Sequence, residues 1–530
     1  MIKSTIDPEC TGQFSPLFLD YIQQQDNIRP FYHLFPTLAN FKKLIESRTF
    51  GQENREVLRQ SLQSQYQEHE LTEATQLNIE RLTQPNTFTV TTGHQLNLFT
   101  GSLYFVYKIV STINLAIQLK QNYPDYDFVP VYWMASEDHD FAEIDHFYFD
   151  GKNYRWKTEQ TGAVGDFLLD DGMKALLKEA SFAPDFFKKA YSERKTLADA
   201  VRHYVNHLFG DRGLVIVDGN SPNLKALFGN IIKDDLLHHS PHRLVQATTE
   251  KLEAMGYRSQ IYPREINFFY LDKGIRQRLE KVGNDYKVLE TGLSFTSSEI
   301  ATLLEKSPER FSPNVVMRPL YQECILPNIA YLGGPAEVAY WLQLKPMFDH
   351  YQIDFPAVMP RNFVMVLDSH AQRKMDALEL QDQEIFVDYD EWKKEYVIKH
   401  ARQDISLSAE KTDLAAVFAT IEQKAKTADP TLGPAAMAAH KRALRIVDQM
   451  ASKLRKAEER NLSTALDRMK ALKSALFPEG SAQERKNNLL QFYLQDPLFV
   501  EKLYAHLDPL DFDFIILKYH DDKNSAKGDL

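Results

Sequence analysis

The stretch that decides the fold reads TVTTGHQLNLFTG at residues 89–101 and FVPVYWMASEDHD at residues 128–140. Each piece begins with an apolar, β-branched run and ends in small or polar residues. Residues 103–120, between the two pieces, are apolar nearly all the way round a helix. The predicted order is strand, loop, helix, strand. Because the ends of parallel strands share one edge of an open sheet, we expect residues 93–95 and 137–140 to face the same crevice.

The rest of the core follows the same pattern. Apolar runs predict further strands at 214–217, 329–332 and 357–367, and turn signals such as Asp150-Gly151 predict antiparallel hairpins between them. The predicted fold class is therefore α/β. A Rossmann-like parallel sheet occupies residues 1–367, with antiparallel insertions at about 144–170 and 257–290.

A charged helical region is predicted after the core. Residues 414–425 form one apolar seam, and a helix of roughly forty residues begins at Ala435, with a slip of its seam register near Glu458 and Asn461. These features predict an antiparallel, coiled-coil-like hairpin within residues 368–506, whose favoured role is to pair two subunits. Residues 507–530 are predicted to hold a return strand and a disordered tail, HDDKNSAKGDL.

The composition excludes several classes of function. Among the 530 residues, 43% are hydrophobic and 25% are charged, as in ordinary globular proteins. The net charge of −11 argues against a nucleic-acid partner bound through its phosphates. No apolar run approaches the about eighteen residues that span a bilayer, so we expect no membrane partner and a cytoplasmic location. The two cysteines, Cys10 and Cys324, fit a reducing compartment.

The loop after the first strand is the first candidate for chemistry. It lacks both the phosphate-binding GxxxxGK[ST] pattern and the dinucleotide-binding GxGxxG pattern. Gly93 would let a ligand approach the backbone. The alternative is a simple strand-to-helix turn in which the histidine is already hydrogen-bonded. The candidate ligand contacts here are Gly93, His94, Gln95, Asn97 and Thr100.

The acidic cluster is the second candidate. Glu137, Asp138, His139 and Asp140 follow an apolar strand directly, and charged groups there must be exposed, paired or functional because an unpaired buried charge is costly. A carboxylate can hold an ammonium group or Mg²⁺, and a histidine can transfer a proton near neutral pH. The spacing matches no zinc signature, so no metal ligands are assigned. The alternative is the N-terminus of a helix, where the helix dipole stabilises acidic side chains.

A third group of candidates follows residue 317. Arginine suits carboxylate or phosphate because its donors form a fork, and Pro335 opens a helix whose free N–H groups could hold an anion. Asp218 ends another predicted strand. Asp218 is therefore a further candidate, and the candidates after residue 317 are Arg318, Gln322, Glu323, Gly333, Gly334, Glu337 and Arg361.

Long motifs in this order resemble one protein family. They are TTGHQLNLFTGSLYFVYKI (91–109), PVYWMASEDHDFAEIDH (130–146) and NVVMRPLYQECILPNIAYLGGPAEVAYWLQLK (314–345), followed by the late coiled coil. Over essentially the whole chain they resemble the cysteine-adding enzymes of bacillithiol biosynthesis, the BshC family. The resemblance implies a Rossmann-like core with connecting-peptide insertions, a coiled coil that pairs two subunits, and a bound adenine nucleotide, ATP or ADP. Family members are expected to carry Gln-Gln where this chain has His94-Gln95, so an essential role for His94 does not follow.

The resemblance also implies the reaction. It joins the carboxyl group of cysteine to the amine of glucosaminyl malate, and a phosphorylated or adenylated carboxyl is the expected intermediate. In our hypothesis Gly93, His94 and the helix start at Gly333-Gly334 cradle phosphate. Glu137 and Asp138 hold the cysteine ammonium or a Mg²⁺, and His139 takes the proton from the attacking amine. Arg318 or Arg361 receives the malyl carboxylates.

The sequence is also compatible with two other classes of function. The protein could be a metal-dependent hydrolase of an amide in the same pathway, with zinc at residues 137–140. Alternatively, it could be a nucleotide-binding scaffold in which the coiled coil is the working part.

Overall fold

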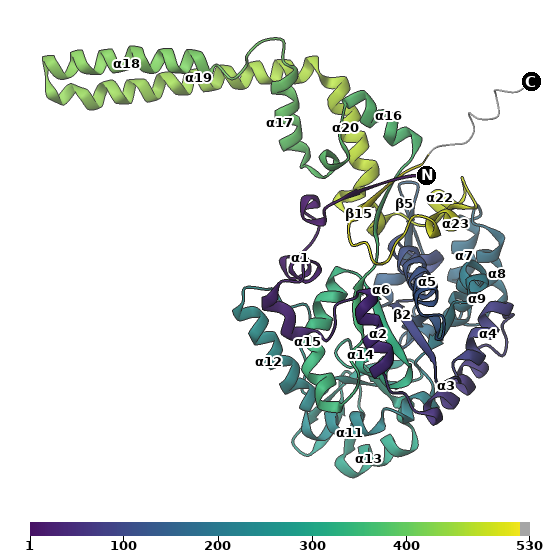
Figure 1. Ribbon diagram of the computed structural model, residues 1–530. Helices are drawn as coiled ribbons and strands as arrows, with labels where there is room; N and C mark the ends of the chain where they lie inside the picture. Colours follow the sequence, from purple (N-terminus) through teal and green to yellow (C-terminus); the bar gives the residue numbers. More distant parts are fainter. Residues whose placement is uncertain (520–530) are drawn as a thin grey trace, which may run out of the picture. The chain divides into compact units, whose positions relative to one another are not determined.

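The computed structural model describes residues 1–519 (Figure 1). It groups them into two compact units, one built mainly from Lys3–Met365 and Ala482–Leu517, the other from Val366–Ser481. The sequence-based boundary at residue 506 differs from this division, because the chain after Ala482 packs within the first unit. The tail predicted at 520–530 lies outside the described residues.

The core of the first unit is a five-stranded sheet of order β13-β12-β2-β3-β6, and every neighbouring pair is parallel. This confirms the Rossmann-like fold class. Its strands are β2 (Thr87–His94), β3 (Asp127–Met134), β6 (Val215–Asp218), β12 (Asn328–Gly333) and β13 (Ala357–Pro360).

The strand order reverses between β2 and β12. From β2 the chain runs through α5 (Tyr104–Asn122) to β3 on one side, and from β12 it runs through α15 (Pro335–Tyr351) to β13 on the other. Leu115 of α5 packs in the cluster with Val90 and Leu332. Trp341 of α15 stacks on Tyr331, the neighbour of Leu332 that points to the opposite face, with ring centroids 4.8 Å apart. The two helices therefore cover opposite faces, and both begin at the edge where the strands end.

Two antiparallel insertions interrupt the parallel core. β4 (His146–Phe149) and β5 (Lys152–Arg155) form the predicted hairpin, with positive φ at Asp150 (48°) and Gly151 (77°), as a tight two-residue turn requires. The second insertion forms a sheet of order β10-β9-β8-β7-β11 and extends beyond the predicted end at residue 290. Its strands are β7 (Phe268–Asp272), β8 (Ile275–Val282), β9 (Asp285–Val288), β10 (Ser294–Thr296) and β11 (Phe311–Pro313).

The remaining elements of the first unit surround these sheets. β15 (Phe514–Lys518), the predicted return strand, lies between β1 (Ile2–Ile6) and β14 (Phe363–Leu367). The principal helices are α1 (Pro16–Ile22), α2 (Leu38–Ser47), α3 (Gln52–Gln65), α4 (Glu73–Arg81), α6 (Phe141–Ile144), α7 (Asp171–Glu179), α8 (Asp185–Glu193), α9 (Leu197–Phe209), α10 (Pro222–Ala226), α11 (Gly229–His238), α12 (Ser240–Ala254), α13 (Ser297–Lys306), α14 (Arg318–Ile325), α21 (Gln483–Lys486), α22 (Leu490–Tyr493) and α23 (Phe499–Tyr504).

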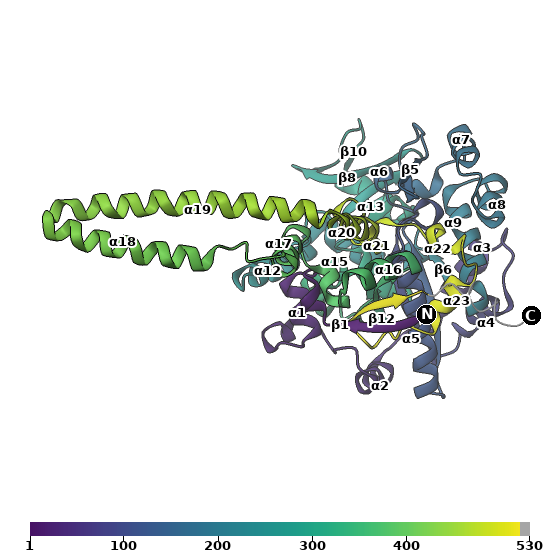
Figure 2. The same cartoon turned by 90° about the horizontal axis from the view of Figure 1, so that it is seen from above.

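The second unit is helical. α18 (Ser408–Ala428) and α19 (Gly433–Asn461) run side by side in both views (Figures 1 and 2) and are joined by an ion pair of 2.7 Å between Lys411 and Asp448. The helix predicted from Ala435 does not continue for forty residues. It breaks at Leu462, beside the predicted register slip, and α20 (Ser463–Leu476) follows. The other helices are α16 (Ser369–Leu378) and α17 (Tyr389–His400). Within residues 1–519, every helix is too short or too polar to cross a bilayer.

A buried ion pair fixes the return segment to the core. Arg361 follows β13, and its two terminal nitrogens donate to the two carboxylate oxygens of Glu484 at 2.8 and 2.6 Å. Both side chains are nearly inaccessible, at 2% and 5% exposure. Removal of one partner from such a pair leaves an uncompensated buried charge, which typically costs about 3–5 kcal/mol.

We predict that Glu484→Ala lowers the free energy of unfolding of the first unit by about 3–5 kcal/mol. The matched control is the double variant Arg361→Met/Glu484→Leu, which removes both charges and should recover most of the loss. Urea unfolding followed by fluorescence measures both. A single variant that unfolds at the wild-type urea concentration would contradict the assignment.

Candidate active site

A cleft of about 830 Å³ opens at the carboxyl ends of β2, β3 and β12. This is the edge at which the strand order reverses, the usual ligand site of an open parallel sheet. The structure brings together there eleven of the residues proposed from the sequence: Gly93, His94, Gln95, Glu137, Asp138, His139, Asp140, Arg318, Gly334, Glu337 and Arg361. The remaining candidates, Asn97, Thr100, Asp218, Gln322, Glu323 and Gly333, are not part of its lining.

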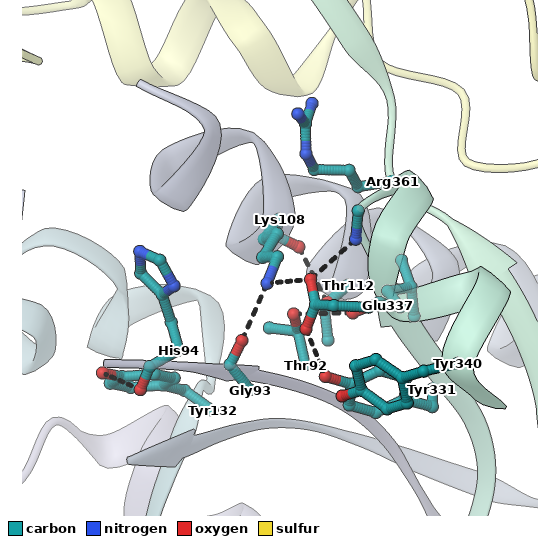
Figure 3. Close-up of polar contacts among 12 residues, drawn as sticks. Thr92, Gly93, His94, Lys108, Thr112, Tyr132, Tyr331, Glu337, Tyr340 and Arg361 are labelled. Atoms are coloured by element: carbon teal, nitrogen blue, oxygen red, sulfur yellow. Dashed lines mark hydrogen bonds and ion pairs between the residues drawn. The ribbon is translucent and has the colours of Figure 1, made fainter. Parts of the chain in front are cut away.

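Lys108 and Glu337 form an ion pair at the centre of the strand reversal (Figure 3). Lys108 Nζ lies 2.5 Å from Glu337 Oε2 and donates to the Gly93 carbonyl at 2.9 Å. Glu337 also accepts from the Tyr331 hydroxyl and from the Gly334 N–H, each at 2.7 Å. Burial alone would raise the pKa of Glu337, but Lys108 and these hydrogen bonds lower it to about 2.

The Gly334 N–H at the start of α15 therefore already has a hydrogen-bond acceptor. Glu337 belongs to the first turn of α15 and places its own carboxylate on the Gly334 N–H, where the sequence hypothesis placed phosphate. A second anion at that N–H would meet the charge of Glu337. The phosphate cradle at Gly333-Gly334 is thus not the arrangement that the structure presents.

His94 is a neutral, hydrogen-bonded side chain. Burial and the nearby Lys108 lower the pKa of His94 to about 3. The Asn97 amide donates to His94 Nε2 at 3.1 Å, and the ring packs against Tyr104 and Phe105. His94 therefore contributes no positive charge to the cleft.

The acidic cluster is paired with cations from distant elements. Glu137 forms an ion pair with the fully buried Lys225 of α10 and accepts from the Ser312 hydroxyl at 3.3 Å. Asp138 lies 3.6 Å from Arg276 of β8 and accepts from the Gln95 amide at 2.9 Å. Burial would raise the pKa of Asp138, but its hydrogen bonds and Arg276 hold that pKa well below its usual range.

Two acids beside these pairs remain accessible. Asp140 and Glu143 are exposed at the cleft, and the Glu143 carboxylate accepts from the Gln95 amide at 2.7 Å. Glu137 and Asp138 already pair with cations of the protein. Asp140 and Glu143 are therefore better placed to bind a cationic group of a ligand. Residues 1–519 contain no group of three or more His, Cys, Asp or Glu side chains arranged to hold a metal ion.

The two candidate arginines differ in their partners. Arg361 is neutralised by Glu484. Arg318 donates to the Gln322 side chain at 3.0 Å and to the Tyr340 hydroxyl at 3.3 Å, and it lies over the Tyr331 ring. No carboxylate of the described residues lies within 4.0 Å of Arg318. Arg318 therefore faces the cleft without a direct ion pair among residues 1–519.

The candidates outside the cleft have structural roles. Asp218 accepts from the Ser136 hydroxyl, and burial raises its pKa. Burial also raises the pKa of Glu323 to about 7, and that side chain accepts from the amides of Gln322 and Asn328. Thr100 is buried with a φ of 72°. The Gly333 carbonyl accepts from the Arg361 N–H at 2.9 Å.

Sequence reasoning missed three cations that organise this site. Lys108 interrupts an apolar helix, so its polarity was a usable signal. Lys225 and Arg276 carried no such signal, because they reach Glu137 and His139 from 88 and 137 residues away in the chain. Only the folded chain shows these pairings.

The fold and the cleft define an α/β protein of the Rossmann-like class with its site at the strand reversal. The model of the "Bacillithiol biosynthesis BshC, N-terminal Rossmann-like domain" matches residues 1–362, and that of the BshC "C-terminal coiled-coil domain" matches residues 364–519. The chain therefore belongs to the BshC family, as the sequence motifs predicted.

Relatives match along nearly their whole length, and each is named "Putative cysteine ligase BshC". The relative from Cytophaga hutchinsonii is 41% identical and covers 96% of this chain and 97% of its own. That from Flavobacterium psychrophilum is 40% identical, with coverage of 98% and 100%. The relative from Bacillus cytotoxicus is 30% identical, with coverage of 91% and 94%.

We predict that Glu337→Gln destabilises the protein in a pH-dependent way. The pKa of Glu337 falls from 4.5 to about 2 on folding, so its ionised form stabilises the fold above pH 4.5. The wild type should exceed the variant by on the order of 3 kcal/mol at neutral pH, and the difference should shrink as the pH falls from about 4.5 to 2. Urea unfolding across this range measures it. A difference that does not depend on pH would contradict the ion pair.

Proposed function

We propose that the protein is a cysteine ligase that joins the carboxyl group of cysteine to the amine of glucosaminyl malate, the last step of bacillithiol biosynthesis. Family membership supports the pathway, and the names of the relatives support the reaction type. The observation that carries the proposal is Arg318, which donates to neutral side chains at the centre of the cleft and has no direct ion pair among the described residues. A reaction that uses cysteine and a nucleotide belongs in the cytoplasm.

Arg318 is the group best placed to receive the malyl carboxylates. A guanidinium binds a carboxylate through two parallel hydrogen bonds, and charge-assisted bonds are the strong ones. A Cβ at Gly93 would lie 3.5 Å from Arg318 Nη1, so Arg318 lies directly against the backbone at the end of β2. Arg361 is not available to bind the malyl carboxylates, because its two terminal nitrogens already donate to the Glu484 carboxylate.

The accessible acids suit the ammonium group of cysteine. Asp140 and Glu143 lie on the cleft wall that follows β3, with their carboxylates exposed. A carboxylate favours the protonated form of a nearby amine. The cysteine amine would then stay protonated, and it could not compete with the amine of glucosaminyl malate for the same carboxyl group.

The reaction also requires activation of the cysteine carboxylate, because an amine does not displace the oxygen of a free carboxylate readily. ATP would supply that activation, and Mg²⁺ would neutralise part of its charge. The Gly334 helix start is occupied by Glu337, so the phosphates need other donors. Arg264, Arg278 and Arg485 line the cleft with exposed side chains and are suited to this role.

We propose in addition that the coiled-coil hairpin pairs two copies of the chain. Val417 and Ile421 of α18 are 54% and 43% exposed, and Ile446 and Met450 of α19 are 66% and 53% exposed. Apolar residues in such a row mark an interaction surface. A second copy of the same hairpin would bury them.

The Arg318 assignment predicts a selective loss of affinity. Arg318→Met should raise the KM for glucosaminyl malate about 100-fold, because a charge-assisted bond contributes about 1.5–3 kcal/mol. The KM of Arg318→Lys should lie between those of the wild type and Arg318→Met. The control substrate is a glucosaminide without the malyl carboxylates. On that substrate wild type and variants should have similar kcat/KM, and an equal loss on both substrates would exclude contact with the malyl group.

One assay separates the ligase from its alternatives. Purified protein receives cysteine, glucosaminyl malate and ATP, and the thiol product, AMP and ADP are followed. A ligase forms thiol product with nucleotide consumption. A metal-dependent hydrolase would instead cleave the amide product and lose activity with a chelator, and a scaffold would bind nucleotide without turnover.

Charged substitutions at the exposed apolar residues of the hairpin test the dimer proposal. Val417→Glu/Ile446→Glu should convert a dimer to a monomer in sedimentation velocity, because each substitution would bury a carboxylate without a partner. Gln423→Glu, an exposed polar position on the same helix, is the matched control and should leave the dimer intact. A wild-type chain that sediments as a monomer at all concentrations would refute the proposal.

A further inference from the structure

His139 lies against a guanidinium group. Arg276 Nη1 is 2.6 Å from His139 Nδ1. A guanidinium has only donors and keeps its protons, so the histidine nitrogen in this contact must be the acceptor. Nδ1 therefore carries no hydrogen, and the hydrogen of the neutral imidazole is on Nε2.

Arg276 is held firmly in this position. Its Nε donates to the Ser312 hydroxyl at 3.1 Å and its Nη2 to the Pro313 carbonyl at 3.3 Å, both from β11. The guanidinium lies over the Phe269 ring at 4.1 Å, and Asp138 compensates its charge at 3.6 Å. The side chain is only 8% exposed. Loss of the His139 contact would leave these other contacts unchanged, so Arg276 stays in place.

This contact occupies the nitrogen through which a neutral His139 would act as a base. Protonation of Nδ1 would set an N–H against the guanidinium N–H across the same 2.6 Å. Asp138, in the same loop, is 3.6 Å from Nδ1, and its charge already faces Arg276. The ring also packs on Phe269 of β7, with centroids 5.3 Å apart. A base accepts a proton on its free nitrogen, and in His139 that nitrogen is the one bound to Arg276.

The His139 ring is accessible from the cleft. The His139 side chain is 41% exposed and lines the cleft wall with Glu137 and Asp140. We infer that His139 works as a neutral hydrogen-bond donor, whose Nε2–H binds the carbonyl oxygen of the cysteine carboxyl group under attack, with Arg276 holding the tautomer. This inference rests on the proposed ligase function, and it replaces the role of proton acceptor that the sequence suggested.

The inferred step forms an amide bond and releases the activated oxygen of the cysteine carboxyl group. The amine nitrogen of glucosaminyl malate forms a bond to the cysteine carboxyl carbon, and negative charge collects on the carbonyl oxygen, where Nε2–H stabilises it. The bond from that carbon to the phosphoryl-bearing oxygen breaks, and the oxygen leaves with the electron pair. The activating co-reactant is a nucleoside triphosphate. The amine proton passes to water in the cleft, while Asp140 and Glu143 keep the cysteine ammonium group.

The tautomer is tested directly by solid-state ¹⁵N NMR on protein labelled at histidine Nδ1. The His139 signal, assigned by its absence from His139→Gln, should have the shift of a bare, hydrogen-bond-accepting nitrogen. A shift typical of a protonated Nδ1 would overturn the inference. This measurement needs no substrate, so it reads the tautomer even if the proposed reaction is wrong.

The role in turnover is tested by a matched pair of variants. The Gln amide extends to the level of Nε2 and can donate there, whereas the Asn oxygen reaches only the level of Nδ1 and can still accept from Arg276. His139→Asn and His139→Ala should lower kcat by about 10²–10³-fold, as expected for a lost oxyanion donor. His139→Gln should lose less than about tenfold, since it restores that donor.

A base mechanism gives the opposite pattern. Glutamine cannot accept a proton in this pH range, so His139→Gln would then fall as far as His139→Ala, by about 10²–10⁴-fold, and the inference would be overturned. Thermal unfolding of each variant checks that the fold is intact. Absence of thiol product with the wild type would instead refute the proposed function and leave the NMR result to decide the tautomer.

Discussion

The reversal of strand order between β2 and β12 is the constraint on which the rest of the structure depends. Chain segments leave these neighbouring strands in opposite directions, and α5 and α15 cover opposite faces of the sheet. Backbone polar groups and two helix starts therefore meet at one edge. The Lys108 and Glu337 ion pair joins the two sides there, and the second insertion and the return segment add residues such as Arg276 and Arg485 around the same edge.

Charge pairing then decides which residues are left for ligands. Lys108 faces Glu337, Lys225 faces Glu137, and Arg361 faces Glu484, and in each pair the cation is buried. A buried charge requires such a partner because its removal from water is costly. Arg318 has the cleft in place of a carboxylate, and a substrate anion would complete its coordination. The cleft thus combines a frame of paired charges with arginines, Arg318 at its centre, that face the cleft without a direct ion pair among residues 1–519.

The parallel sheet, both insertions and the helical hairpin could be predicted from the sequence, because apolar periodicity and turn residues act locally. The edge that carries Gly93 and His139 followed from strand order alone. The partners of these residues could not be predicted in the same way, because Arg276 reaches His139 from another sheet, 137 residues along the chain. The same limit explains why Arg318 and Arg361 looked equivalent. Only the fold shows that Glu484 neutralises one of them.

The central claim is that this cleft forms an amide bond through an activated cysteine carboxyl group. It is tested most directly by turnover of cysteine labelled with ¹⁸O in its carboxyl group, together with glucosaminyl malate and ATP. The account predicts thiol product in which one carboxyl ¹⁸O has been lost and has appeared in phosphate or AMP, according to the leaving group. Thiol product without transfer of ¹⁸O to any phosphorus compound, or no product at all, would contradict it.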